Sequence, residues 1–211
     1  MKSEVPVKEE LIIEAALRRF AHFGFNKTTF SEIAKDMGIS QQSMYYYFSD
    51  KKSLIIKVAA NVMASLIAAM QERVDACNSL LDRLRGIIEA KEAFFEKYFM
   101  LATETPNEKL GDTDELHCFI KQMQSEQQAI FIAAFEKAIS EGEIGQIDAT
   151  KKAALLLNAL NAMQDNYRKT HIIPDHQAIR DLFEEQKELI RIFVFGLKYQ
   201  ADLTGFKNGK D

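Results

Sequence analysis

Apolar residues recur at the three- and four-residue spacing of α-helices along nearly all of the 211 residues. Only three prolines and nine glycines interrupt this spacing. No stretch alternates apolar and polar residues clearly enough to predict a strand. The sequence therefore predicts an all-α protein with about nine helices.

Cap and breaker residues place the ends of these helices. Thr29 and Glu32 have the T-x-x-E spacing of a capping box, and Ser40 can cap the next helix. A loop or short turn is expected at residues 108–112, and the last nine residues are expected to be frayed. The expected helices run over about residues 7–23, 29–37, 41–48, 50–77, 80–102, 115–140, 148–169 and 174–200.

Two short expected helices are separated by only Gly38, Ile39 and Ser40. Two short helices joined by a Gly-containing turn are typical of a helix-turn-helix. Apolar residues of both helices, the turn and the next helix can form a small core with residues 7–23: Ile33, Ala34, Met37, Ile39, Met44, Phe48, Leu54, Ile55 and Val58. The sequence thus predicts an N-terminal three-helix unit.

The side of the third helix opposite this core is polar and aromatic. At about 100° per residue, burial of Met44 and Phe48 leaves Gln42 and Tyr46 facing away from the core. Gln can pair with adenine, Ser can bond base or phosphate, and Tyr can reach phosphates and thymine methyls. The expected DNA-contacting residues are Thr29, Ser31, Gln41, Gln42, Ser43, Tyr45, Tyr46, Tyr47 and Lys51.

Other roles remain open for some of these residues. The tyrosines could pack between helices, and Thr29 could act mainly as a cap. Lys51 and Lys52 could simply be a solvated helix start, or they could bind phosphate where free N–H groups and the helix dipole favour an anion.

Residues 8–58, about a quarter of the chain, hold a pattern of small, aromatic, glycine and lysine positions at fixed spacing. The pattern consists of Ala15-Ala16, Phe20, Gly24, Thr28-Thr29, Ile33-Ala34, Gly38-Ile39-Ser40, Met44-Tyr45-Tyr46-Tyr47-Phe48 and Lys51-Lys52-Ser53-Leu54. This pattern resembles that of the TetR/AcrR transcriptional repressors. Ser31 and Glu32 depart from it, since many members have a basic residue there. The rest of the chain resembles the family only in helix count and order.

The resemblance implies a DNA-binding domain at residues 1–50 and an antiparallel helical domain for effector binding and dimerisation at residues 51–211. The charged residues are also distributed unevenly between the two parts of the chain. Residues 1–57 hold nine Lys/Arg and seven Asp/Glu, whereas residues 58–211 hold 18 and 24. This asymmetry suggests that the two parts face different partners.

The last two expected helices are apolar over wide faces, which predicts a four-helix bundle between two copies. A purely intramolecular core is the alternative. Helix-turn-helix proteins usually dimerise because one recognition helix reads too few base pairs. The expected interface residues are Leu155, Leu182, Leu189 and Phe193.

The middle helices are rich in Phe and Met, which can enclose an adaptable apolar cavity, although ordinary core is the commoner reason for aromatics at this spacing. The resemblance implies a small-molecule effector here, apolar or amphipathic. The expected pocket residues are Phe94, Tyr98, Phe99, His117, Met123, Asn158 and Asn161.

Several classes of protein are not expected. Two cysteines are too few for a disulfide framework, and with a polar N-terminus and short apolar runs they suggest the cytoplasm and no membrane. Neither a metal cluster nor a catalytic motif is visible, so no metal, cofactor or enzyme activity is expected.

The sequence favours a repressor that an effector releases from a palindromic operator. Two alternatives remain: an architectural or cell-cycle factor of the same fold without a ligand, and a small-molecule binding protein that has lost DNA binding.

Overall fold

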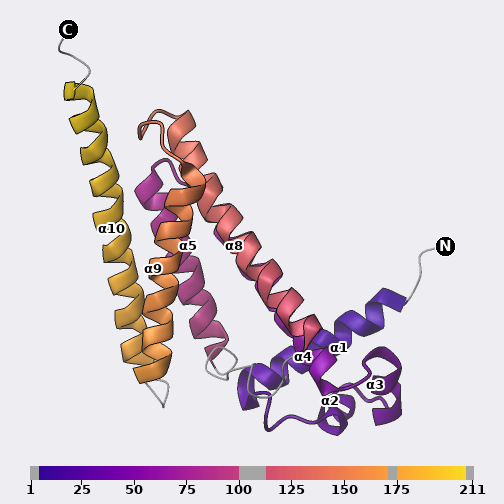
Figure 1. Ribbon diagram of the computed structural model, residues 1–211. Helices are drawn as coiled ribbons and strands as arrows, with labels where there is room; N and C mark the ends of the chain where they lie inside the picture. Colours follow the sequence, from indigo (N-terminus) through magenta and orange to yellow (C-terminus); the bar gives the residue numbers. More distant parts are fainter. Residues whose placement is uncertain (1–4, 100–112, 171–174, 208–211) are drawn as a thin grey trace. The chain divides into compact units, whose positions relative to one another are not determined.

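The computed structural model describes residues 5–99, 113–170 and 175–207, with side chains over residues 9–99, 113–170 and 175–199. These residues form eight α-helices and no strand, which confirms the all-α prediction (Figure 1). The loop expected at residues 108–112 lies outside them. The helices are α1 (Val5–Phe23), α2 (Phe30–Asp36), α3 (Gln41–Tyr47), α4 (Lys51–Ala76), α5 (Leu80–Lys97), α8 (Asp114–Ser140), α9 (Ala149–Thr170) and α10 (His176–Lys207).

Side-chain caps fix the starts of the long helices. The Asp50 carboxylate accepts a hydrogen bond from the Ser53 backbone N–H at 2.8 Å, and the Asp148 carboxylate accepts one from the Lys151 N–H at 3.0 Å. Each cap satisfies an N–H that has no partner inside the helix. The end of α10 differs from expectation: the helix continues to Lys207, seven residues past the expected end, because the lone Gly205 does not break it.

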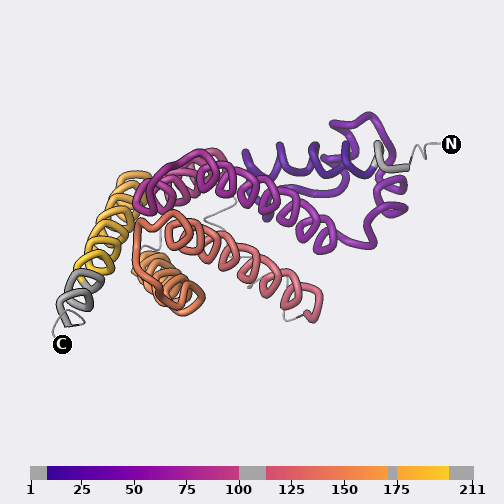
Figure 2. The backbone as a smooth tube through the Cα atoms, turned by 90° about the horizontal axis from the view of Figure 1, so that it is seen from above, coloured from indigo at the N-terminus to yellow at the C-terminus, as the bar shows by residue number. Residues whose placement is uncertain are grey.

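Contacts between residues divide the chain into two compact units. Unit 1 comprises Met1–Ser65 and Phe94–Met123, and unit 2 comprises Leu66–Ala93 and Gln124–Asp211. The helices α4, α5 and α8 each continue from one unit into the other, as the tube in Figure 2 allows the reader to follow. The functional boundary after residue 50 stays a prediction.

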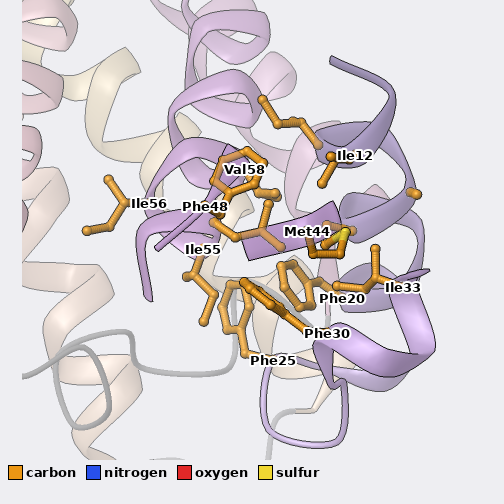
Figure 3. Close-up of a cluster of buried hydrophobic side chains, with 14 of the residues drawn as sticks. Ile12, Phe20, Phe25, Phe30, Ile33, Met44, Phe48, Ile55, Ile56 and Val58 are labelled. Atoms are coloured by element: carbon orange, nitrogen blue, oxygen red, sulfur yellow. The ribbon is translucent and has the colours of Figure 1, made fainter. Parts of the chain in front are cut away.

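The core of unit 1 is formed by α1, α2, α3, the start of α4 and part of α8. Phe20, Phe30 and Met44 point toward one another (Figure 3). The Phe20 and Phe25 rings meet edge to face, with their centroids 5.1 Å apart. The core expected for the helix-turn-helix is confirmed, with Met37 and Ile39 only partly buried at its edge.

Unit 2 is held by aromatic packing and by polar links between its helices. The rings of Phe135 on α8 and Phe193 on α10 lie 6.2 Å apart. Gln186 on α10 donates a hydrogen bond to the Leu160 carbonyl of α9 at 3.0 Å. The Lys187 ammonium forms an ion pair with Glu92 of α5 at 2.7 Å. These contacts join α5, α9 and α10 at one level of the bundle.

Within the described residues, one helix, α4, is long and apolar enough to cross a membrane by length and composition. The runs of consecutive apolar residues suggested that no segment was long enough, but α4 meets the test with interspersed polar residues such as Asn61 and Ser65. Core helices of soluble proteins meet the same test, so one such helix is weak evidence for a membrane span.

Candidate nucleic-acid interface

The start of α2 is closed by the capping box that the sequence predicts. The Thr29 hydroxyl accepts a hydrogen bond from the Glu32 backbone N–H at 3.3 Å, and the Thr29 N–H donates to the Glu32 carboxylate at 2.8 Å. The Thr29 hydroxyl also donates to that carboxylate at 2.8 Å. Thr29 therefore acts as a cap, and its predicted DNA contact stays a prediction.

The turn between α2 and α3 depends on Gly38, whose φ of 65° lies in the left-handed region. The Ile39 N–H donates to the Ala34 carbonyl at 3.0 Å and the Gly38 N–H to the Lys35 carbonyl at 3.2 Å. This pair of bonds is the Schellman motif, which satisfies two carbonyls at the end of α2. Glycine adopts this backbone conformation without the steric cost of a Cβ, so the turn can be this short.

The helix α3 begins at a serine cap and is fixed by its buried side. The Ser40 hydroxyl accepts from the Ser43 N–H at 3.1 Å and lies 2.8 Å from the Ser43 hydroxyl. Met44 and Phe48 are buried in the unit 1 core. Because the core holds one side of α3, the direction in which the other side faces is fixed as well.

The opposite side of α3 faces solvent. Tyr46 is 81% exposed and Tyr45 is 53% exposed. Gln41 and Gln42 are exposed as well. These exposures argue against the alternative in which the tyrosine run packs between helices.

Ring contacts hold the tyrosines in place without burying them. The Tyr45 ring lies 5.1 Å from that of the buried Phe30, and the Tyr46 ring meets that of the half-buried Tyr47 edge to face at 5.1 Å. A side chain that is already held loses less conformational entropy on binding. Of the other predicted residues, Ser31 is exposed, while Ser43 and Lys51 are half-buried.

An ion network joins α1 to α2. Arg19 forms a bidentate pair with Asp36, and its guanidinium lies 3.5 Å from Glu32. The hydrogen bond from Arg19 lowers the pKa of Asp36, and the hydrogen bonds from Thr29 lower the pKa of Glu32. Both carboxylates near the expected DNA surface are thus paired inside the protein. The helix α3 itself carries no charged side chain.

The residues expected to form an effector pocket fall in both units. Phe94, Tyr98, Phe99, His117 and Met123 belong to unit 1, whereas Asn158 and Asn161 belong to unit 2. The rings of Phe94 and Tyr98 lie 4.7 Å apart. His117 and Asn158 are exposed, and Asn161 is half-buried. The pocket stays a prediction.

The residues expected at a dimer interface have mixed exposure. Leu155 on α9 is exposed, Leu182 is buried in its own unit, and Leu189 and Phe193 are half-buried. The sequence reasoning missed three exposed apolar residues of α10: Ile192, Phe195 and Tyr199. Their spacing of three and four residues was the available signal, since it places them on one side of a helix.

Among the described residues, no three His, Cys, Asp or Glu side chains come together in a way that could hold a metal ion. The expected absence of a metal stays a prediction.

Two short helices joined by a tight turn, with a polar exposed face on the second, define a helix-turn-helix DNA-binding protein. Comparison with known proteins places the N-terminal part in a family. Residues 12–58 match the family model for bacterial regulatory proteins of the tetR family. The HTH-type transcriptional repressor KstR2 of Mycolicibacterium smegmatis is 22% identical over 142 residues, which cover 66% of this chain and 69% of that protein.

Solved structures share the fold over most of the chain. A transcriptional regulator from Cytophaga hutchinsonii superposes with a TM-score of 0.80 at 23% identity, over 90% of this chain and 98% of its own. The regulator FadR of Bacillus subtilis, solved in complex with stearoyl-CoA, superposes with a TM-score of 0.65 at 22% identity, over 86% and 96%. The chain is a helix-turn-helix transcriptional regulator whose residues 12–58 match the tetR family, as the resemblance in its sequence implies.

Proposed function

We propose that the protein is a homodimeric repressor that binds a palindromic operator through α3 and is released from it by a small-molecule effector. The observation that carries this proposal is the face of α3, where Gln42 and Tyr46 are exposed while Met44 is completely buried. The core fixes the helix, and the residues left outside are suited to reading bases in a major groove.

The proposed dimer surface lies on α9 and on the C-terminal part of α10. Leu155, Ile192, Phe195 and Tyr199 are each more than half exposed. Exposed apolar side chains that gather on one helix side mark an interaction surface. The same side of α10 is acidic nearer its start, with the following exposed residues: Asp181, Glu184, Glu185 and Glu188. A second copy would therefore pack on the C-terminal part.

A two-fold dimer would place two copies of α3 in successive major grooves about 34 Å apart. Release requires an effector that favours a different geometry by about 1–3 kcal/mol. FadR, a structural relative, was solved with stearoyl-CoA, and this supports an amphipathic effector for the present chain. A cytoplasmic location follows from the role, because such a regulator acts on bacterial DNA.

The experiment that tests the proposal is selection from randomised duplex DNA, repeated at two salt concentrations. A retained palindrome, with affinity that falls steeply as salt rises, is expected for a dimer that contacts phosphates and bases. Weak binding without sequence preference would contradict the role of α3. The retained palindrome is then placed in a reporter promoter, which shows whether binding of the protein to it represses transcription.

A further inference from the structure

Lys91 is a buried lysine in the core of unit 2. It lies on α5 with 8% of its surface exposed, next to the buried residues Ile87, Ile88 and Ala90. Among the residues that the structure describes, its ammonium has no hydrogen-bond or ion-pair partner. A buried charge without a partner costs several kcal/mol. Such a group is therefore rare unless it has a counter-ion during function.

The acidic residue that follows Lys91 in the sequence is paired with another cation. Glu92, the next residue, binds the Lys187 ammonium at 2.7 Å, and Glu184 binds the same ammonium at 2.8 Å. Burial, followed by the positive charge of Arg168 of α9, lowers the pKa of Lys91 to about 8. Asp165, which lies 3.8 Å from Arg168, is largely exposed to solvent. Arg168, whose side chain is 62% exposed, therefore adds positive potential at Lys91 from the surface.

A second buried polar group of unit 2, on α10, also has an atom without a partner in the described part of the chain. Glu92 and Lys187 join α5 to α10, and the residues directly before them are Lys91 and Gln186. Gln186 is fully buried; its amide N–H binds the Leu160 carbonyl, but its Oε1 has no partner in the described part of the chain. The surrounding core is otherwise apolar and includes Phe183.

We propose that Lys91 is the binding site for the anionic head group of the effector, a carboxylate or phosphate on an apolar body. This inference rests on the proposed effector function and narrows it to one chemical class. The ammonium would donate to the anion, Arg168 would add positive potential, and the Gln186 oxygen could accept from a hydroxyl or N–H of the ligand. Hydrogen bonds between charged groups in a water-poor site are about twice as strong as neutral ones.

The test compares three ten-carbon probes that share an apolar body: decanoate, decyl phosphate and 1-decanol. Binding to the full chain at pH 7 is measured by calorimetry and by the shift in Tm. The two anions should bind about 10- to 100-fold more tightly than decanol, as expected for one charged hydrogen bond. In Lys91→Met this preference should disappear, and in Arg168→Gln it should weaken. Lys169→Met, an exposed lysine of α9, should leave it unchanged.

Circular dichroism shows whether each variant is folded. Equal binding of the anions and decanol to the native chain, anion binding retained by Lys91→Met, or no binding of either anion would each overturn the proposal. Inorganic phosphate alone should bind weakly, because it lacks the apolar body. An assay of release from the operator distinguishes a failure of the proposed binding site from a failure of the proposed effector function. Anion binding at Lys91 without release contradicts the effector role, while release by neutral compounds alone contradicts the site.

Discussion

Replacing Lys91 by methionine should make the protein more stable at neutral pH. Burial, reinforced by Arg168, lowers the pKa of Lys91 from the ordinary value of 10.5 to about 8. A difference of one in pKa corresponds to about 1.36 kcal/mol, so the charged side chain costs the folded state about 3 kcal/mol. Methionine fills nearly the same volume without a charge.

The pH dependence has a defined sign. Between pH 8 and 10.5 the unfolded chain binds more protons at Lys91 than the folded chain, so the free energy of unfolding rises with pH across this window. Below pH 8 both states are protonated and the full cost is present. The advantage of Lys91→Met should therefore be about 3 kcal/mol at pH 7 and fall to about 1 kcal/mol at pH 10.

Urea unfolding of both proteins at pH 7, 8.5 and 10 measures this difference. Protein concentration must be fixed, because the proposed dimer would add to apparent stability. The other titrating groups are common to both proteins and cancel in the difference. Lys169→Met, at an exposed position, should show no pH-dependent gain. A variant less stable than the native chain at pH 7, or a difference that stays constant up to pH 10, would refute the reasoning.

Four other predictions concern the DNA and dimer surfaces. Tyr46→Ala should weaken operator binding by about 1–3 kcal/mol in a gel-shift titration while sedimentation still shows a dimer, whereas a lost dimer would indicate a structural role. Gly38→Ala should lower stability by about 1 kcal/mol in urea unfolding, because the space is open and only the left-handed φ opposes a Cβ; an unchanged midpoint would contradict this. Phe195→Glu should dissociate the dimer in sedimentation, while Thr150→Glu, an exposed change on α9, should not; a stable Phe195→Glu dimer excludes this surface. Lys51→Ala should reduce the slope of log affinity against log salt by about one, and an unchanged slope would remove Lys51 from the phosphate contacts.

The helix-turn-helix was predictable because its signals are local. Thr29, Gly38 and Ser40 each act within a few residues of their own position, and a capping box or a left-handed glycine has the same meaning in any fold. The direction of α3 followed from its spacing, since Met44 had to face the core.

The outer parts of unit 2 depend on packing that the sequence does not encode locally. Phe193 and Phe195 are both apolar, yet the first contacts Phe135 and the second faces solvent. When apolar residues cover more than one face of a helix, the sequence does not show which of them pack into the core of the same chain. The burial of Lys91 had no signal in the sequence, because a single lysine in a helix is ordinarily solvated.

The neutral face of α3 has a consequence for how such a regulator can evolve. No charged residue lies between Gln41 and Tyr47, so attraction to the DNA backbone must come from other helices. Sequence-independent attraction to DNA depends on charge. Exchanges among neutral residues of α3 would therefore change the preferred bases without altering the sequence-independent affinity for DNA. A duplicated copy could thus acquire a new operator through a few substitutions in seven residues, while its search along the chromosome remained as before.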